Sequence, residues 1–276
     1  GEMDARYRQF EVLDDNRLKL YLISRYGQLG LWERLQQTGR GRYFQVIGEV
    51  ANAWKLVNDE MLDIDAVSEH DADLGAVLRE LETAMDRDCF IDFSLMIRRV
   101  ADALATGDPV ACAALSPPPH LHVDEYQDVN PAQETLIRAM RALSQTLFVC
   151  GDDDQALYGW RGADVSNILE FASRYPDAAE HTLARNFRST PAIVEAADSF
   201  VVAELGPSRL PKDPQADVTD EPRDLRRVWF GDRAEEADWV AERIDALLGS
   251  AYREKDDGRI RGLTPADVAI LMRSTR

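Results

Sequence analysis

The stretch His120-Leu-His-Val-Asp-Glu-Tyr-Gln-Asp128 decides the fold class, because a short strand over 120–123 runs directly into a group of carboxylates. Residues 131–143 then have the periodicity of a helix, and Thr146-Leu-Phe-Val-Cys150 is a second short strand that ends in an acidic turn. Strands that alternate with helices predict an α/β fold, in which helices cover both faces of a parallel sheet. Functional side chains gather at the carboxyl ends of such strands, so we expect the site at these two acidic strand ends.

The chain on either side of this stretch shows two different patterns. Residues 17–115 carry apolar side chains at helical spacing almost throughout, and the prolines at 117–119 end that helical half. Beyond residue 150 strands and helices continue to alternate, interrupted by a surface connection rich in Pro and Asp over 204–224. The further predicted elements are a helix over 164–175, a strand over 181–183, a helix that begins at Thr190-Pro191, a strand over 225–230, a helix over 234–248 and a strand over 268–272.

The composition is that of a globular protein with a large negative charge. The 276 residues have a formal net charge of −18, and 45% of them are hydrophobic. No run approaches 18 apolar residues, which argues against a membrane span. Cys89, Cys112 and Cys150 are scattered, so neither a disulfide framework nor a thiolate zinc site is expected. We therefore expect a cytoplasmic protein that does not hold nucleic acid through bulk positive charge.

Adjacent carboxylates at the end of the first strand suit metal-assisted phosphoryl chemistry. Asp124 and Glu125 point to different sides of the chain, so they can take different roles. One carboxylate can hold a hydrated Mg²⁺ that bridges phosphates, and the other can orient and deprotonate an attacking water. A bare Asp-Glu pair is more often a solvated turn, so the surrounding residues have to decide between these readings.

Three motifs follow one another along the chain, namely Val123-Asp-Glu-Tyr-Gln-Asp128, Gly151-Asp-Asp-Asp-Gln-Ala-Leu-Tyr-Gly-Trp-Arg-Gly-Ala163 and Leu183-Ala-Arg-Asn-Phe-Arg-Ser-Thr190. Together they resemble the UvrD/Rep/PcrA group of superfamily 1 DNA helicases. Weaker similarity to the same group is found at Phe10–Asp14, Cys89–Phe93 and Val268–Arg273. The resemblance therefore covers nearly the whole chain.

This resemblance implies a RecA-like, P-loop NTPase-type parallel sheet with a large N-terminal helical insertion. Residues 1–116 would be the mostly helical insertion subdomain of the first motor domain, residues 117–203 its RecA-like core, and residues 204–276 the start of a second RecA-like domain. The implied activity is that of an ATP-dependent 3′–5′ DNA helicase or translocase, which acts on single-stranded DNA in repair or replication. Its implied cofactors are ATP and Mg²⁺.

The resemblance also assigns four catalytic residues. Asp124 would be the Mg²⁺ carboxylate, and Glu125 would be the catalytic base. Gln155 looks like the γ-phosphate sensor, since its amide can donate to a phosphate oxygen and accept from a water. Arg188 would reach the γ-phosphate, because a planar and permanently charged guanidinium suits the transferring phosphoryl group.

Four further residues are assigned to ligand binding. Phe187 stands where the family commonly has a tyrosine on the adenine, and it keeps the stacking face without the hydroxyl. Arg161 would serve the nucleotide. Trp160 would stack on a base of single-stranded DNA, whereas Tyr158 suits such a stack and a core position equally.

A phosphate loop, Gly-x-x-x-x-Gly-Lys-[Ser/Thr], is missing from the sequence. The four lysines follow Leu18, Trp54, Pro211 and Glu254, so the chain contains no Gly-Lys pair. We therefore expect the interior segment of a longer helicase, whose partners are the remaining segments of that protein and single-stranded DNA, but no membrane. This chain alone is expected to hydrolyse ATP negligibly and to bind single-stranded DNA weakly, with a strong dependence on salt.

Two other classes of function remain open on the sequence. A helicase-derived interaction or regulatory module, or one subunit of a split helicase, would explain the missing loop without truncation. A scaffold, however, has no use for several reaction-specific residues at once. A two-metal nuclease would instead use Asp124, Glu125, Asp128 and Asp152–Asp154, and DNA cleavage with Mg²⁺ but without ATP would identify it.

Overall fold

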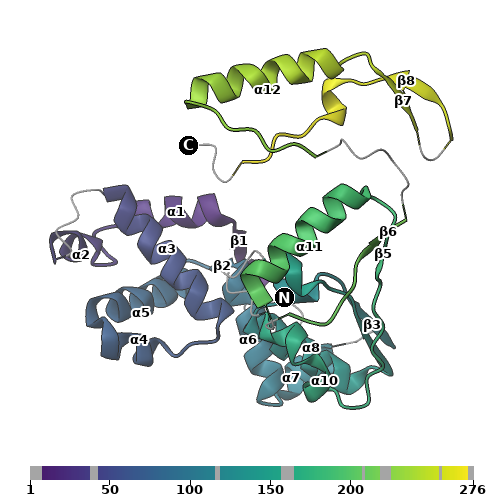
Figure 1. Ribbon diagram of the computed structural model, residues 1–276. Coiled ribbons are helices and arrows are strands. Elements are labelled where there is room, and N and C mark those ends of the chain that lie inside the picture. The colour runs from purple at the N-terminus through teal and green to yellow at the C-terminus, as the bar shows by residue number, and fades with distance from the viewer. Residues whose placement is uncertain are drawn as a thin grey trace. The chain divides into compact units, whose positions relative to one another are not determined.

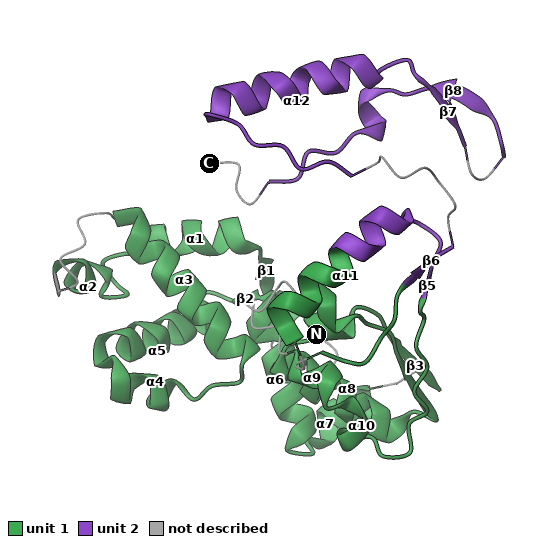
Figure 2. Ribbon diagram, viewed as in Figure 1, with its two compact units in different colours: residues 1–184, 197–214 green, residues 185–196, 215–276 purple. Residues whose placement is uncertain are grey.

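The structure is a computed structural model, which describes residues 8–37, 43–115, 119–156, 165–206, 209–217, 225–254 and 257–272. The chain divides into two compact units. Unit 1 comprises residues 1–184 and 197–214, and unit 2 comprises residues 185–196 and 215–276 (Figure 2). Within unit 1 we call the described residues 8–115 the helical part, and those of 119–184 and 197–214 the motif part.

The helical part combines one short pair of strands with a series of helices. Strands β1 (Glu11–Leu13) and β2 (Phe90–Asp92) pair in parallel, with Val12 opposite Ile91. The helices are α1 (Asp15–Ser24), α2 (Leu31–Gln37), α3 (Tyr43–Asp59), α4 (Ile64–His70), α5 (Ala72–Arg87), α6 (Phe93–Ala105) and α7 (Pro109–Ala114) (Figure 1). The predicted helical character of residues 17–115 is confirmed, and β2 is the strand that the periodicity did not reveal.

Aspartate side chains begin many of these helices. A carboxylate before the first helical residue accepts hydrogen bonds from backbone N–H groups that have no partner inside the helix, and its charge suits the positive end of the helix dipole. These aspartates therefore have a local structural use. The capping residues of α1, α4, α5, α6 and α7 are Asp14, Asp63, Asp71, Asp92 and Asp108.

An apolar core fills the helical part. Its largest side chain is Trp54 of α3, which is 1% exposed, and it packs with fully buried residues of other elements such as Leu22 and Leu78. The Trp54 Nε1–H donates to Asp92 Oδ2 at 2.9 Å, so the core contacts the cap of α6 directly. Burial raises the pKa of Asp92 above its usual range, although hydrogen bonds from Leu95 and Trp54 act in the opposite direction.

The motif part contains the two strands that the sequence predicted first. Strand β3 (His120–Val123) pairs in parallel with β4 (Thr146–Val149), and α8 (Pro131–Leu143) connects them (Figure 1). Asn130 caps α8 in a capping box with Gln133, as expected for Asn followed by Pro at the first helical position. Helix α8 packs against α6 of the helical part. Both strands and the helix are therefore confirmed.

The end of the motif part differs from the prediction. The helix expected over 164–175 is described as two short helices, α9 (Ser166–Leu169) and α10 (Phe171–Arg174), and tertiary contacts hold each turn. The Asn167 amide of α9 donates to the Val129 carbonyl at 2.9 Å, while the Phe171 ring of α10 packs edge-on against another aromatic ring. The predicted strand over 181–183 is wrong, because these residues pair with no strand in the described part of the chain.

Unit 2 has few regular elements among its described residues. Strand β5 (Arg185–Asn186) pairs in parallel with β6 (Gln215–Ala216), and β7 (Ala251–Arg253) pairs antiparallel with β8 (Ile260–Gly262). The helices α12 (Arg233–Leu247) and α11 (Pro191–Leu205) confirm the two helices predicted here, although α11 continues into unit 1 (Figure 2).

Two strands predicted for unit 2 are wrong. Residues 225–230 and 268–272 have the apolar pattern of strands, but neither segment is a strand in the structure. Trp229 is 79% exposed and Leu271 is 93% exposed. An apolar run favours an extended chain, whereas a strand also needs a hydrogen-bonded neighbour, and no described residue supplies one.

The sheets of the described residues are smaller than the parallel sheet, covered by helices on both faces, that the sequence predicted. Among the described residues the strands form four two-stranded pairs, three of them parallel. The protein is therefore a mixed α/β structure with short parallel pairs. Within the same described ranges, no helix has the length and apolarity that a membrane span needs.

Candidate functional site

Two neighbouring strand ends bring the acidic motifs together in unit 1. Because β3 and β4 are parallel, Asp124 and Gly151 both lie just beyond the carboxyl ends of paired strands. The Cys150 N–H donates to the Val123 carbonyl at 2.9 Å, and the Tyr126 N–H donates to the Cys150 carbonyl at 3.0 Å. These backbone bonds hold the two acidic turns side by side.

Asp124 and Glu125 form a tight turn directly after β3. Glu125 has a left-handed backbone with φ of 52°, a conformation that costs a residue with a side chain about 1–2 kcal/mol. Its N–H donates to Asp124 Oδ1 at 3.0 Å, which stabilises the turn. Both residues are exposed, so their carboxylates are accessible to a ligand.

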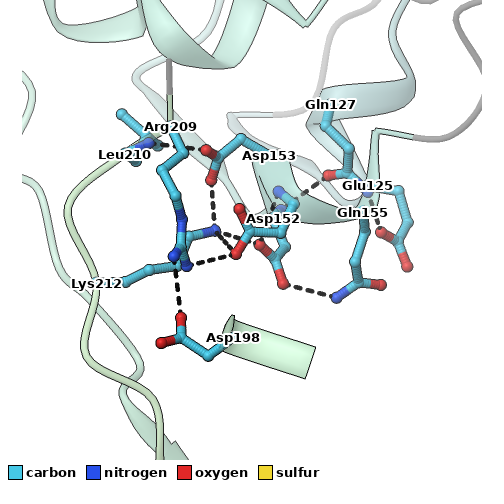
Figure 3. A network of polar contacts seen from close by, with 10 residues as sticks. Glu125, Gln127, Asp152, Asp153, Gln155, Asp198, Arg209, Leu210 and Lys212 are labelled. Carbon is cyan, nitrogen blue, oxygen red and sulfur yellow. Dashed lines mark hydrogen bonds and ion pairs between the residues drawn. The ribbon is translucent and has the colours of Figure 1, made fainter. Parts of the chain in front are cut away.

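A buried amide joins this turn to the next one. Gln127 is 1% exposed, and its Nε2 donates to Glu125 Oε2 at 2.7 Å. The Oε1 atom of the same side chain accepts from the Asp152 N–H at 2.9 Å (Figure 3). One side chain therefore fixes the Glu125 carboxylate relative to the backbone that leads to Gln155.

Gly151 makes this close approach possible. A Cβ atom at this position would lie 2.6 Å from Gln127 Oε1 and 2.9 Å from the Cδ1 atom of Ile168. Both distances are shorter than van der Waals contact, so any side chain here would push Gln127 away from Asp152. The Gln127 amide of the first motif thus requires the glycine that begins the second motif.

Gln155 is exposed and is held by the turn that precedes it. Its Nε2 donates to Asp152 Oδ2 at 2.8 Å (Figure 3). Burial raises the pKa of Asp152, but hydrogen bonds from Lys212 and Gln155 outweigh burial and hold that pKa below its usual range. Asp152 is therefore a charged acceptor for the Gln155 amide at neutral pH.

Two cations face the aspartate run that contains Asp152. Lys212 Nζ lies 2.5 Å from Asp152 and from Asp153, and 3.0 Å from Asp154. Arg209 pairs with Asp154 at 2.7 Å and with Asp198 at 2.9 Å (Figure 3). A metal ion at these carboxylates would have to displace Lys212, which disfavours the two-metal nuclease that the sequence left open.

A cluster of buried polar side chains supports the two turns. Tyr126 is fully buried, and its hydroxyl donates to Glu134 Oε2 at 2.7 Å. Arg174 donates to Glu134 Oε1 at 3.1 Å and to Asn167 Oδ1 at 3.0 Å. Burial, followed by the hydrogen bond to Glu134, raises the pKa of Tyr126. Arg174 thus supports the fold of the motif part.

Residues 185–190 of the third motif lie in unit 2 and form their own turn. Asn186 Oδ1 accepts from the N–H groups of Arg188 and Ser189 at 2.9 and 2.8 Å. Phe187 is 63% exposed, and the Arg185 guanidinium lies 5.4 Å from the centre of its ring. Residues 186–189 line an open depression of about 590 Å³, where Phe187 and the exposed Arg188 are accessible.

Three of the residues assigned to ligand binding stand near the end of the second motif. Tyr158, Trp160 and Arg161 lie outside the described residues. Their roles, like those of Asp124, Glu125, Gln155, Arg188 and Phe187, therefore remain predictions. The structure brings Asp124, Glu125 and Gln155 into one unit, and it describes Phe187 and Arg188 in the other.

Sequence reasoning missed two residues that organise the site. Gln127 lies inside the first motif, two positions after Glu125, so its place in the motif was a signal that could have been used. Lys212 is 60 residues from Asp152 along the chain and is surrounded by loop residues. No local pattern in the sequence pointed to it.

The comparison with protein families identifies the chain. Residues 7–176, more than half of its length, match the UvrD/REP helicase N-terminal domain. The chain belongs to this family. The first two motifs that carried the resemblance lie inside the matched region, which also includes the helical part from β1 onward.

Several bacterial proteins named ATP-dependent DNA helicase PcrA are similar to this family member. It is 35% identical to the protein of Leuconostoc citreum over 205 residues, which are 73% of this chain and 26% of that helicase. It is 35% identical to the protein of Staphylococcus aureus strain NCTC 8325 over 159 residues, 56% of this chain and 21% of the relative. The chain thus covers about a quarter of the length of these relatives.

Proposed function

We propose that the chain is the interior segment of an ATP-dependent DNA helicase or translocase that moves 3′ to 5′ on single-stranded DNA in repair or replication. The observation that carries this proposal is the buried Gln127 amide, which links the turn of Glu125 to the turn of Gln155. A base and a phosphate sensor have to act on the same phosphoryl group, and a rigid link between them keeps their separation constant. An interaction module would have no need for that link.

Each polar residue has a defined task in this proposal. Asp124 presents an exposed carboxylate, the hard oxygen ligand that Mg²⁺ prefers, so the residue fits the metal of a Mg²⁺–ATP complex. Glu125 orients and deprotonates the attacking water, and the Gln155 amide contacts the γ-phosphate. Bound Mg²⁺–ATP would supply the phosphoryl group, and its metal would supply the positive charge that neutralises the phosphate oxygens. Arg188 and Arg161 stabilise the phosphates, and Phe187 stacks on the adenine.

The remaining parts of the chain complete the proposal. Residues 1–116 form the helical insertion of the first motor domain, residues 117–203 its RecA-like core, and residues 204–276 the start of a second RecA-like domain. Trp160, with Tyr158, stacks on bases of the DNA strand. Because the sequence has no Gly-Lys pair, the phosphate loop belongs to another segment of the parent helicase.

The experiment that tests the catalytic proposal starts with the native protein. An antibody raised against this chain measures the mass of the native product in its source cell and isolates that product. We expect a polypeptide several hundred residues longer, with DNA-stimulated ATPase activity that Glu125→Gln lowers at least about 100-fold. The matched control is Glu80→Gln, which changes an exposed glutamate of α5 and should leave turnover unchanged.

Two outcomes would contradict this proposal. A native product near 31 kDa, the mass of this chain, would favour a regulatory module or one subunit of a split helicase. DNA-stimulated hydrolysis by this chain alone would show that its catalytic parts are complete without a phosphate loop.

A binding experiment tests the DNA contact separately. Fluorescence anisotropy with a labelled single strand should show weak binding that falls steeply as salt is raised. Trp160→Ala should weaken it further by about 1–3 kcal/mol, because one base loses its stacking partner. Trp32→Ala in the helical part is the control with a half-exposed tryptophan. Submicromolar binding at physiological salt that Trp160→Ala leaves unchanged would exclude this contact.

A further inference from the structure

A lysine ammonium occupies the centre of the three consecutive aspartates in the second motif. One carboxylate oxygen from each of Asp152, Asp153 and Asp154 lies within 4.8 Å of the other two, a separation at which like charges repel. The Lys212 side chain is 16% exposed and makes an ion pair with each of the three, of which Asp152 and Asp153 are labelled in Figure 3. Lys212, together with Arg209 at Asp154, therefore provides the positive charge that lets these carboxylates stay together.

The two oxygens of Asp152 have different partners. Oδ1 faces Lys212 Nζ at 2.5 Å, while Oδ2 accepts from Gln155 Nε2 at 2.8 Å. The backbone N–H of Asp152 is bound to Gln127, and Oδ1 also accepts from the Asp154 N–H at 3.2 Å, so four hydrogen bonds hold the residue. Because the backbone N–H and Oδ1 of Asp152 are fixed, the direction of Oδ2 is set. Oδ2 is the acceptor for Gln155.

This contact determines which end of the Gln155 amide faces outward. A carboxylate only accepts hydrogen bonds, so it must bind the NH₂ group of the amide. One N–H is then used, and the carbonyl oxygen and the second N–H of exposed Gln155 are presented to other groups. A residue that contacts a phosphate oxygen and a water at the same time needs both this carbonyl oxygen and this second N–H.

The segment that carries Lys212 is anchored independently of it. The Leu210 N–H donates to Asp153 Oδ2 at 2.8 Å, and Arg209, with a side chain 9% exposed, bridges Asp154 and Asp198. These contacts keep residues 209–212 on the aspartate run when the Lys212 charge is removed. A substitution at Lys212 can therefore report on Gln155 without releasing the whole segment.

We propose that Lys212 is a positioning residue for Gln155, which acts by holding Asp152 in the orientation that binds and orients the Gln155 amide. The inference deepens the proposed function, on which the catalytic meaning of Gln155 rests. The positioning itself is a property of this chain and needs no nucleotide.

The first test measures the position of the Gln155 amide directly. In the chain labelled with ¹⁵N-glutamine, the side-chain NH₂ signals of Gln155 are assigned by their loss in Gln155→Glu. We expect Lys212→Met to shift both proton signals toward those of a free amide, whereas Lys212→Arg keeps them near the wild-type positions. Lys19→Met, at an exposed site on α1, is the control for loss of a lysine charge elsewhere and should cause no shift.

A second neutral variant, Lys212→Gln, repeats the test with a polar side chain. Unchanged Gln155 signals in a folded Lys212→Met or Lys212→Gln protein would overturn the proposal. Unfolding of both variants, seen by circular dichroism, would overturn it as well, because Lys212 would then be required for the fold of the whole unit.

The second test uses the native full-length protein and separates this inference from the proposed function. We expect Lys212→Met to lower kcat for DNA-stimulated ATP hydrolysis about tenfold with little change in KM for ATP, and Lys212→Arg to restore most of it. Shifted Gln155 signals with no ATPase in the wild-type protein would contradict the proposed function and leave the positioning intact. Normal ATPase in Lys212→Met with unshifted signals would contradict the positioning alone.

Discussion

Different interactions stabilise the helical part and the motif part of unit 1. In the helical part the described residues include an apolar cluster of twenty buried hydrophobic side chains, whereas the corresponding cluster of the motif part has five. The motif part instead relies on buried polar groups, among them Gln127, Asp153 and Glu134. A strand end that presents carboxylates to a ligand cannot also be packed with apolar side chains, so hydrogen bonds and ion pairs have to stabilise it.

The largest expected effect lies in the apolar core of the helical part. Trp54→Ala should lower the free energy of unfolding by about 3–5 kcal/mol, because it leaves a cavity and removes the hydrogen bond to Asp92. Phe44→Ala on the same helix, at a site 74% exposed, should change it by no more than about 0.5 kcal/mol. Urea unfolding followed by circular dichroism gives both values. Equal effects would show that the helical part is not stabilised by its apolar core.

The ion pairs of the two parts should differ in strength as well. Arg209→Met in the motif part should cost about 1.5–3 kcal/mol, because it leaves the half-buried Asp154 without one of its charged partners. Arg79→Met in the helical part removes an exposed pair with Asp65, and it should cost less than about 1 kcal/mol. The same urea experiment compares them. A cost for Arg79→Met as large as that for Arg209→Met would argue against polar stabilisation specific to the motif part.

Two glycine substitutions should change stability in opposite directions. Gly151→Ala should destabilise by about 1–3 kcal/mol, since its Cβ would collide with Gln127 and Ile168. Gly48→Ala lies inside α3, and apart from its chain neighbours and the backbone of its own helix nothing is within 4 Å of the new Cβ, so it should stabilise by about 0.5–1 kcal/mol. Thermal unfolding of the two variants shows the signs directly. A stable Gly151→Ala protein with an unchanged fold would contradict the close approach of the two turns.

The smallest expected effect is a difference in pH dependence. The lowered pKa of Asp152 stabilises the protein above the unfolded value of about 3.9, and this contribution is lost as the pH falls through the folded pKa. The raised pKa of buried Asp92 acts in the opposite sense, because the native state binds the proton more readily and gains stability as the pH falls.

Substitution of each residue isolates its contribution. Between pH 6 and pH 3, Asp152→Asn should lose less stability than the wild-type protein, and Asp92→Asn should lose more. Urea midpoints measured across this range test both signs. If the urea midpoint changed equally with pH in both variants, the distinction between a paired and a buried carboxylate would be wrong.

Local sequence patterns predicted the elements whose causes are local. Asn130 and Pro131 begin α8 because a cap and a fixed φ act within one turn, and the predicted boundaries were correct. The strands expected at 181–183, 225–230 and 268–272 were wrong for the opposite reason. An alternating or apolar run favours an extended chain, but its pairing depends on a neighbour that the run itself does not specify.

The sequence by itself determined the chemistry that is available at the site. The two acidic strand ends, the order of the three motifs and the family all follow from residues that are contiguous in the chain. Only the tertiary structure decided how these residues support one another. Gln127, which follows β3, binds Asp152, which follows β4. Lys212 also binds Asp152, although 60 residues separate the two along the chain. Such contacts form when packing brings distant segments together, and no periodicity in either segment encodes the partner.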